Sequence, residues 1–169
     1  FLNTAKLRRF MPAVKSASPR SSPKRVGVPD PKNLILLATP WGAGDRENYQ
    51  KYPYRLYSQI GIRMASLGYE VFVPHEEYGQ RRVPDFLEKV EDAVDKSHLV
   101  LAHLIDSPQV IQIMDWAENK KVITFEDTLR PCKSPAEMLR NADVVGRVRY
   151  ETWDEAINGL EREVRSYFG

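Results

Sequence analysis

Short apolar runs alternate with amphipathic segments from residue 33 to the end of the sequence. Apolar runs bounded by turn residues predict strands covered on both faces, because a strand with one wet face would alternate polar and apolar residues. The run at 98–105 is the most apolar and is expected at the centre of the sheet, whereas 143–150 is more polar and is expected at an edge. The predicted strands are residues 33–40, 70–74, 98–105, 121–125 and 143–150.

Between the strands, apolar residues recur at helical spacing, which predicts helices that each bury one face. Ser107 and Pro108 suit the cap and the first position of one helix, and S/T-x-x-E patterns at Ser134 and Thr152 predict two further helix starts. Because strands and helices alternate, the sequence predicts an α/β domain with a doubly wound, five-stranded parallel sheet. The last helix is expected to bury a stripe made of Trp153, Ile157, Leu160, Val164 and Tyr167 or Phe168. The predicted helices are residues 53–67, a segment from near Pro84, a segment from Pro108, residues 134–137 and a segment from Thr152.

The carboxyl ends of parallel strands form the crevice in which α/β proteins bind their ligands. Acidic residues at these ends could form a metal or acid–base site, since grouped carboxylates shift one another's pKa. They also occur as adjacent pairs in loops, where solvated surface charge is the usual explanation, so both interpretations stay open. The residues at the predicted strand ends are Thr39, Pro40, Trp41, His75, Glu76, Glu77, Asp106, Glu126 and Asp127.

The histidines and the single cysteine do not occur at spacings typical of catalysis or metal binding. His98 and His103 lie five residues apart in one strand, so alternation sends them to opposite faces and one metal ion cannot easily take both. His75 has no partner at ligand spacing, and we expect hydrogen-bonded structural histidines, no metal site and no cofactor. Cys132 lies in a loop with no neighbouring base to activate it, so a nucleophilic role is not expected.

Composition places the chain in a broad class. It is 42% hydrophobic and 28% charged, which is typical of a globular domain. No apolar run reaches the roughly 20 residues of a membrane-spanning helix, so no membrane span is expected. One cysteine excludes an internal disulfide framework.

The charge is distributed unevenly. Residues 1–29 hold seven basic side chains and no Asp or Glu, whereas the rest of the chain holds 18 basic and 23 acidic groups. An Arg-rich, Ser-containing and acid-free segment is typical of an organelle transit peptide, or of a basic arm left by processing one. We therefore expect an arm and linker at 1–32, a globular domain at 33–169 and a location in the mitochondrial matrix. The residues expected to contact RNA or a partner are Lys6, Arg8, Arg9, Lys15, Arg20, Lys24 and Arg25.

Such an arm suits contact with phosphates regardless of sequence, because Lys and Arg supply salt-sensitive affinity for nucleic acid. Acidic surfaces of neighbouring proteins would attract it equally well. Both rRNA and acidic protein surfaces remain open as its partners.

Several motifs in the middle of the chain occur in a recognisable order. A strand ends in LLATP, DAVDKSHLVLAHLID runs from a helix into the next strand, and a helix carrying Trp116 and Ala117 leads to NKKVI. Over residues 33–125 this order resembles the nucleoside 2-deoxyribosyltransferase-like family. The resemblance implies a flavodoxin-like parallel sheet and cleavage of a glycosidic bond through a Glu nucleophile in the helix after Asp106.

The sequence departs from the family pattern at the positions that carry the chemistry. His98 replaces an Asp, residues 107–109 replace a Gly-Thr turn, and the nucleophilic Glu falls on Ile111 or Ile113. An isoleucine has no lone pair with which to attack an anomeric carbon. Asp106 survives among the family's polar landmarks and by itself supports ligand contact.

These observations favour a non-catalytic structural subunit of a large mitochondrial assembly. The mitochondrial ribosome is the first expectation because a basic arm suits rRNA, and a respiratory or ATP-synthase complex is the next. The alternative is a nucleoside or nucleotide N-glycosidase or deoxyribosyltransferase that uses a relocated carboxylate such as Asp106 or Glu77. A third possibility is a module that binds a nucleotide without converting it. If a ligand pocket is retained, it is expected to contain Thr39, Trp41, Glu77 and Asp106.

Overall fold

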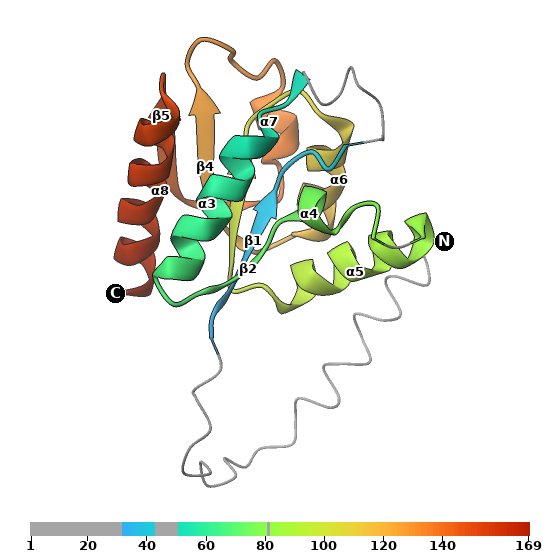
Figure 1. Ribbon diagram of the computed structural model, residues 1–169. Coiled ribbons are helices and arrows are strands. Elements are labelled where there is room, and N and C mark those ends of the chain that lie inside the picture. The colour runs from blue at the N-terminus through green and yellow to red at the C-terminus, as the bar shows by residue number, and fades with distance from the viewer. Residues whose placement is uncertain (1–31, 43–50, 81) are drawn as a thin grey trace, which may run out of the picture. The chain divides into compact units, whose positions relative to one another are not determined.

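The computed structural model describes residues 32–42, 51–80 and 82–169 (Figure 1). The seven basic residues of the expected arm lie outside the described residues. Lys32–Gly169 form one compact unit. None of the described helices has the length and apolar character that a membrane crossing requires.

The sheet consists of β1 (Leu34–Ala38), β2 (Glu70–Phe72), β3 (Leu99–His103), β4 (Lys121–Asp127) and β5 (Asp143–Tyr150). All strands are parallel and their order is β2-β1-β3-β4-β5. Every residue of β3 is buried, which confirms the predicted central strand, and β5 is an edge strand as expected. The order is that of the flavodoxin-like doubly wound sheet, so the predicted fold class is confirmed.

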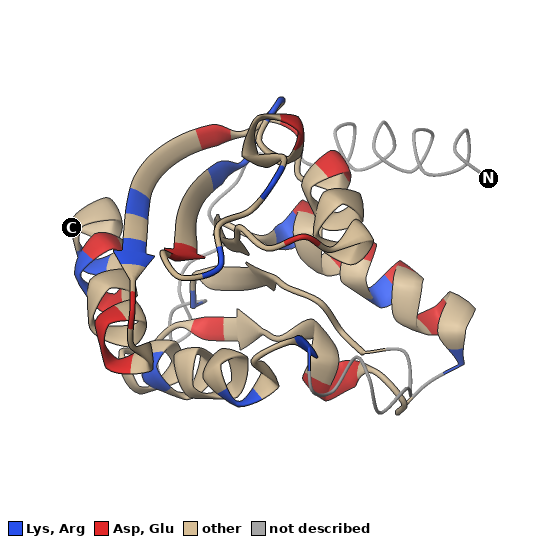
Figure 2. Ribbon diagram, turned by 90° about the horizontal axis from the view of Figure 1, so that it is seen from above, with Lys and Arg blue, Asp and Glu red and all other residues tan. Residues whose placement is uncertain are grey.

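Helices cover both faces of this sheet (Figures 1 and 2). On one face, α3 (Tyr54–Ser66) and α8 (Trp153–Phe168) share a hydrophobic core with the sheet. On the other face, α5 (Val83–Lys96) and α6 (Pro108–Trp116) build a second core. The short helices α4 (Pro74–Glu77) and α7 (Pro135–Met138) follow β2 and β4.

Local chemistry explains where the elements begin and end. The second strand stops at Phe72 rather than at residue 74, because Pro74 has no N–H for the ladder and instead begins α4. Ser107 caps α6 as predicted, since its Oγ accepts the N–H of Gln109 at 3.2 Å. Ser134 occupies the N-cap position of α7, so the predicted helix start is confirmed, but its side chain makes no capping hydrogen bond.

The start of α8 is capped as predicted, because Thr152 Oγ1 accepts the N–H of Glu155 at 3.2 Å. The middle of its predicted apolar stripe is buried, and Phe168 stacks on Tyr69 with ring centroids 4.9 Å apart. Trp153 departs from the prediction, because 41% of its surface is exposed at the first position of the helix. The indole of Trp153 is therefore partly open to solvent near the carboxyl ends of the strands.

Candidate functional site

The first turn of α6 is where the resemblance places a catalytic carboxylate, and no acidic residue occupies it. Ile113 is fully buried, and Ile111 is partly buried against the same core. Gln109 reaches back to the segment after β1, where its Oε1 accepts the N–H of Trp41 at 2.8 Å. The turn therefore joins α6 to the segment after β1 by packing and one hydrogen bond.

The other residues expected to line a retained pocket have structural contacts of their own. Thr39 is fully buried, and its hydroxyl has no hydrogen-bond partner among the described residues. Trp41 packs edge-on against Phe86 with ring centroids 5.4 Å apart. Glu77 forms an ion pair with Lys89, with 2.6 Å between Oε2 and Nζ.

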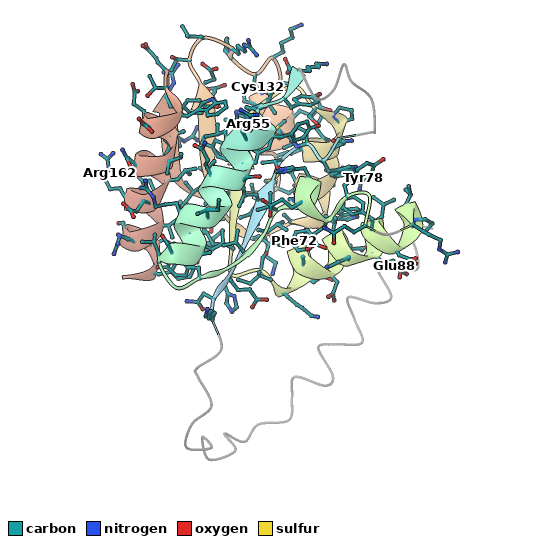
Figure 3. The ribbon with its side chains drawn as sticks, viewed as in Figure 1. Arg55, Phe72, Tyr78, Glu88, Cys132 and Arg162 are labelled. Carbon is teal, nitrogen blue, oxygen red and sulfur yellow. The ribbon has the colours of Figure 1, made fainter. Side chains whose placement is uncertain are left out.

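Asp106 and Glu126 hold the loop that follows β4. Asp106 Oδ1 accepts the N–H of Lys133 at 3.0 Å and lies 3.6 Å from Cys132 Sγ, and Glu126 Oε2 accepts the N–H of Cys132 at 3.1 Å. Burial raises the pKa of the Cys132 thiol, a hydrogen bond from the backbone at Ser134 opposes this, and the Asp106 carboxylate adds to the rise. The Cys132 thiol therefore stays protonated at neutral pH and is a poor nucleophile (Cys132 is labelled in Figure 3).

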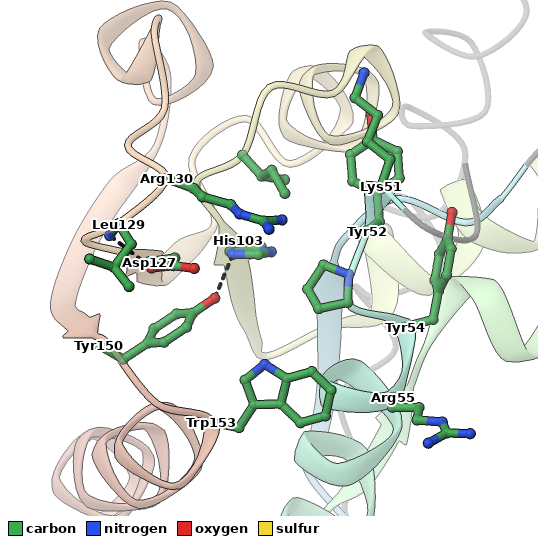
Figure 4. Close-up of a pocket in the computed structure, with 12 residues that line it drawn as sticks. Lys51, Tyr52, Tyr54, Arg55, His103, Asp127, Leu129, Arg130, Tyr150 and Trp153 are labelled. Carbon is green, nitrogen blue, oxygen red and sulfur yellow. Dashed lines mark hydrogen bonds between the residues drawn. The ribbon is translucent and has the colours of Figure 1, made fainter. Parts of the chain in front are cut away.

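A cavity of about 560 Å³ opens at the carboxyl ends of β3, β4 and β5, beside the first turns of α3 and α8 (Figure 4). We call it the strand-end cavity. None of Thr39, Trp41, Glu77 and Asp106 lines it, and Asp127 alone does so among the strand-end residues named from the sequence. Its lining consists of Lys51, Tyr52, Pro53, Tyr54, Arg55, His103, Ile105, Asp127, Leu129, Arg130, Tyr150 and Trp153.

His103 lies at the base of this cavity and is 2% exposed. Its Nδ1 lies 2.6 Å from the hydroxyl of Tyr57, and its Nε2 lies 2.9 Å from the hydroxyl of Tyr150. The ring stacks on Phe125, with centroids 4.6 Å apart and an interplanar angle of 1°. His98 Nδ1 accepts the N–H of Leu34 at 3.0 Å, so the prediction of hydrogen-bonded histidines is confirmed for both residues.

The protons of this group can be assigned by counting donors and acceptors. Burial lowers the pKa of His103 to about 3, so the ring is neutral at physiological pH and has one N–H and one lone pair. Tyr57 is fully buried and has no other partner among the described residues, so its hydroxyl is satisfied only by donating to Nδ1. The Nε2–H then donates to the Tyr150 oxygen. The opposite tautomer would leave a buried hydroxyl proton without an acceptor, at a cost of about 1–3 kcal/mol.

In this arrangement the hydroxyl proton of Tyr150 is directed away from His103 and toward the cavity. Burial raises the pKa of Tyr150, the Asp127 carboxylate adds to the rise, and the Arg130 guanidinium opposes it. The hydroxyl therefore stays protonated and serves as a hydrogen-bond donor at neutral pH.

Charged and aromatic groups surround that hydroxyl. Figure 4 shows the guanidinium of Arg130 over the His103 side of the cavity and the indole of Trp153 on the facing wall. Arg130 has no ion pair within 4.0 Å among the described residues. Asp127 is the one carboxylate among the described lining residues, and its Oδ1 accepts the N–H of Leu129 at 2.8 Å. The charged and aromatic groups around the Tyr150 hydroxyl can hold an anion and a planar ring. In the described part of the chain, no group of three metal-binding side chains occurs.

The sequence contains signals for this cavity that the strand-end rule did not use. Tyr150 is the last residue of β5, a strand end that is absent from the list drawn from the sequence. Residues 51–55 place two tyrosines and two cations directly before and within the first turn of a helix. His103 was identified only as a structural residue, because its position between two tyrosines depends on tertiary contacts.

Comparisons with known proteins agree with the observed architecture. No model of a protein family and no curated protein matches the sequence. Among solved structures, the CMP N-glycosidase BcmB of Clostridium botulinum matches with a TM-score of 0.55 and 18% identity, over 77% of this chain and 98% of that one. A 2-deoxyribosyltransferase of Bacillus psychrosaccharolyticus matches with a TM-score of 0.48 and 14% identity, over 74% and 90% of the two chains. The chain shares the fold of the CMP N-glycosidase, and its flavodoxin-like parallel sheet is the one that the sequence resemblance implied.

The buried histidine makes stability depend on pH in a direction that can be tested. The pKa of His103 is about 3 in the folded chain and near 6.5 when unfolded, so only the unfolded chain binds a proton between these values. Its contribution to stability is complete above pH 6.5 and decreases as the pH falls, by about 1.4 kcal/mol per unit. The difference in unfolding free energy between the wild type and His103→Gln should therefore shrink by this amount between pH 6 and pH 5, as measured by urea denaturation.

His75 also has a pKa that is lowered, chiefly by burial, and it would add its own pH dependence equally in both proteins. Taking the difference between wild type and variant cancels that contribution. Parallel stability profiles of the two proteins would contradict the assignment of a neutral, buried His103.

Proposed function

We propose that this chain is a non-catalytic subunit of a large mitochondrial assembly, built on a deoxyribosyltransferase-like fold. The observation that carries the proposal is the start of α6, where Ile111 and Ile113 occupy the two positions at which the sequence resemblance places the nucleophile. The two acids considered as its replacement are engaged elsewhere, since Asp106 holds the loop after β4 and Glu77 pairs with Lys89. The fold is retained and the attacking group is replaced by apolar packing.

The mitochondrial ribosome is the assembly that we favour, and a respiratory or ATP-synthase complex is the next candidate. The support is compositional: residues 1–29 carry seven basic and no acidic side chains. A segment of this kind suits transit into the mitochondrial matrix and contact with rRNA phosphates or acidic protein surfaces.

Sedimentation of mitochondrial extracts tests this proposal. The full chain should migrate with a large mitochondrial complex, and a variant in which the seven basic arm residues are replaced by Gln should be lost from it, because the phosphate or carboxylate contacts are removed. RNase treatment separates the two kinds of partner: release indicates an rRNA contact, and retention indicates a protein contact. Absence of the full chain from every large mitochondrial complex would contradict the proposal.

A second candidate function is N-glycosidase or deoxyribosyltransferase activity with a relocated carboxylate. Asp106 and Glu77, the residues first considered for this role, have structural partners. The observation that favours the candidate is instead Asp127, which lines the strand-end cavity together with the Tyr150 hydroxyl. A single carboxylate offers less than the acid and nucleophile pair with which most glycoside hydrolases work, so this candidate ranks second.

Base release from a panel of deoxynucleosides and deoxynucleoside monophosphates distinguishes the two functions. We expect none from the full chain at high protein concentration, because no carboxylate replaces the nucleophile at the first turn of α6. Release that is abolished in Asp127→Asn and retained in Asp106→Asn would instead establish the enzyme and assign its carboxylate.

A further inference from the structure

The strand-end cavity has the properties of a binding site, and it lies away from the first turn of α6. Its volume of about 560 Å³ is within the range of roughly 300–1,000 Å³ of small-molecule pockets. Polar groups and aromatic rings converge on it from β3, β4, β5, α3 and α8 and the segments between them. We propose that it binds a small organic anion carrying a planar ring, with the anionic group between Arg130 and Tyr150 and the ring against Trp153.

The first argument is the balance of charge. Three cationic side chains (Lys51, Arg55 and Arg130) and one anionic side chain (Asp127) line the cavity. Arg130 is the cation that matters most, because Figure 4 shows its guanidinium over the cavity near His103. It has no ion pair among the described residues, and a planar guanidinium matches the paired oxygens of a phosphate or carboxylate.

The second argument is the orientation of the Tyr150 hydroxyl. The buried Tyr57 hydroxyl donates to His103 Nδ1, and the Nε2–H donates to Tyr150, so the proton of Tyr150 is left for an acceptor in the cavity. The Tyr150 hydroxyl has no second hydrogen-bond partner among the described residues. An oxyanion placed between this hydroxyl and Arg130 would receive two hydrogen bonds from groups already in position.

The third argument is the exposed indole. Trp153 belongs to the apolar stripe of α8 by sequence, yet it lies beside the cavity and is 41% exposed. Figure 4 shows its ring on the wall that faces Arg130. A planar ring stacked on the indole would cover apolar surface that the fold leaves in water.

Nucleoside monophosphates and ring carboxylates both combine an anionic group with a planar ring. Comparing their affinities shows whether the site prefers a phosphate or a carboxylate. Calorimetric titration of the full chain with AMP, CMP, UMP and orotate should reveal at least one complex with a Kd below about 1 mM. Adenosine, ribose 5-phosphate and inorganic phosphate, each of which lacks either the anion or the ring, should bind at least about tenfold more weakly, because each forgoes one of the two contacts.

Three variants test the geometry. Arg130→Ala, Tyr150→Phe and Trp153→Ala should each weaken binding of the preferred probe by about tenfold or more, since each removes a hydrogen bond to a charged group or a stacking surface. Arg162→Ala is the matched control, because Arg162 is an exposed arginine on α8 that does not line the cavity, and it should leave the Kd unchanged. Thermal unfolding of Tyr150→Phe checks that this variant is folded. Arg130 is exposed, so its replacement should not disturb folding and tests the site even if Tyr150→Phe is unstable.

Three results would overturn the proposal. The first is that none of the four ring-bearing anions binds with a Kd below about 1 mM. The second is that Arg162→Ala weakens binding as much as Arg130→Ala, and the third is that none of the three cavity variants weakens it. In either case the anion would be attracted by net charge or by the basic N-terminal residues.

Discussion

Two hydrogen bonds to His103 join the central strand of the sheet to a helix and to the edge strand. Tyr57 comes from α3 and Tyr150 from β5, so one imidazole at the end of β3 connects three elements that are distant in sequence. Both contacts are buried, and a buried polar group is costly unless each of its donors and acceptors is satisfied. This requirement fixes the tautomer of His103 and, through it, the direction in which the Tyr150 hydroxyl points.

The polar groups that could bind a ligand do not lie where the sequence resemblance places the catalytic residue. The start of α6 keeps its cap and its apolar face, while isoleucines occupy the positions at which the sequence resemblance places a nucleophile. The polar groups that lie open to a ligand are found instead over β3, β4 and β5. A domain of this kind can serve an assembly through its surface and still retain a cavity for a small molecule, and the two proposals do not depend on each other.

Much of the fold could be predicted from the sequence because it depends on local patterns. The strand at 98–105 is apolar on both faces and proved to be central, and the Ser107-Pro108 pair marked the start of α6 correctly. The predicted boundary of a strand was wrong where a single residue determines it, as Pro74 does at the end of β2. The strand-end cavity was not predicted from the sequence, apart from Asp127, since rules about strand ends identify positions but not the direction of a side chain. Asp106 follows a strand end, yet its carboxylate accepts a hydrogen bond from the loop after β4. Tyr150 and Trp153, in contrast, line the cavity because of tertiary packing.

The protonation of the two ring nitrogens of His103 tests the central claim most directly. In nitrogen-15-labelled full-length protein at neutral pH, two-bond proton–nitrogen couplings report which nitrogen carries a proton, and the loss of those signals in His103→Gln assigns them. The account predicts a neutral ring with a proton on Nε2 and a bare Nδ1 that accepts from Tyr57. A proton on Nδ1, or on both nitrogens, would contradict it, because the hydroxyl of Tyr150 would then donate to His103 or lose its fixed direction.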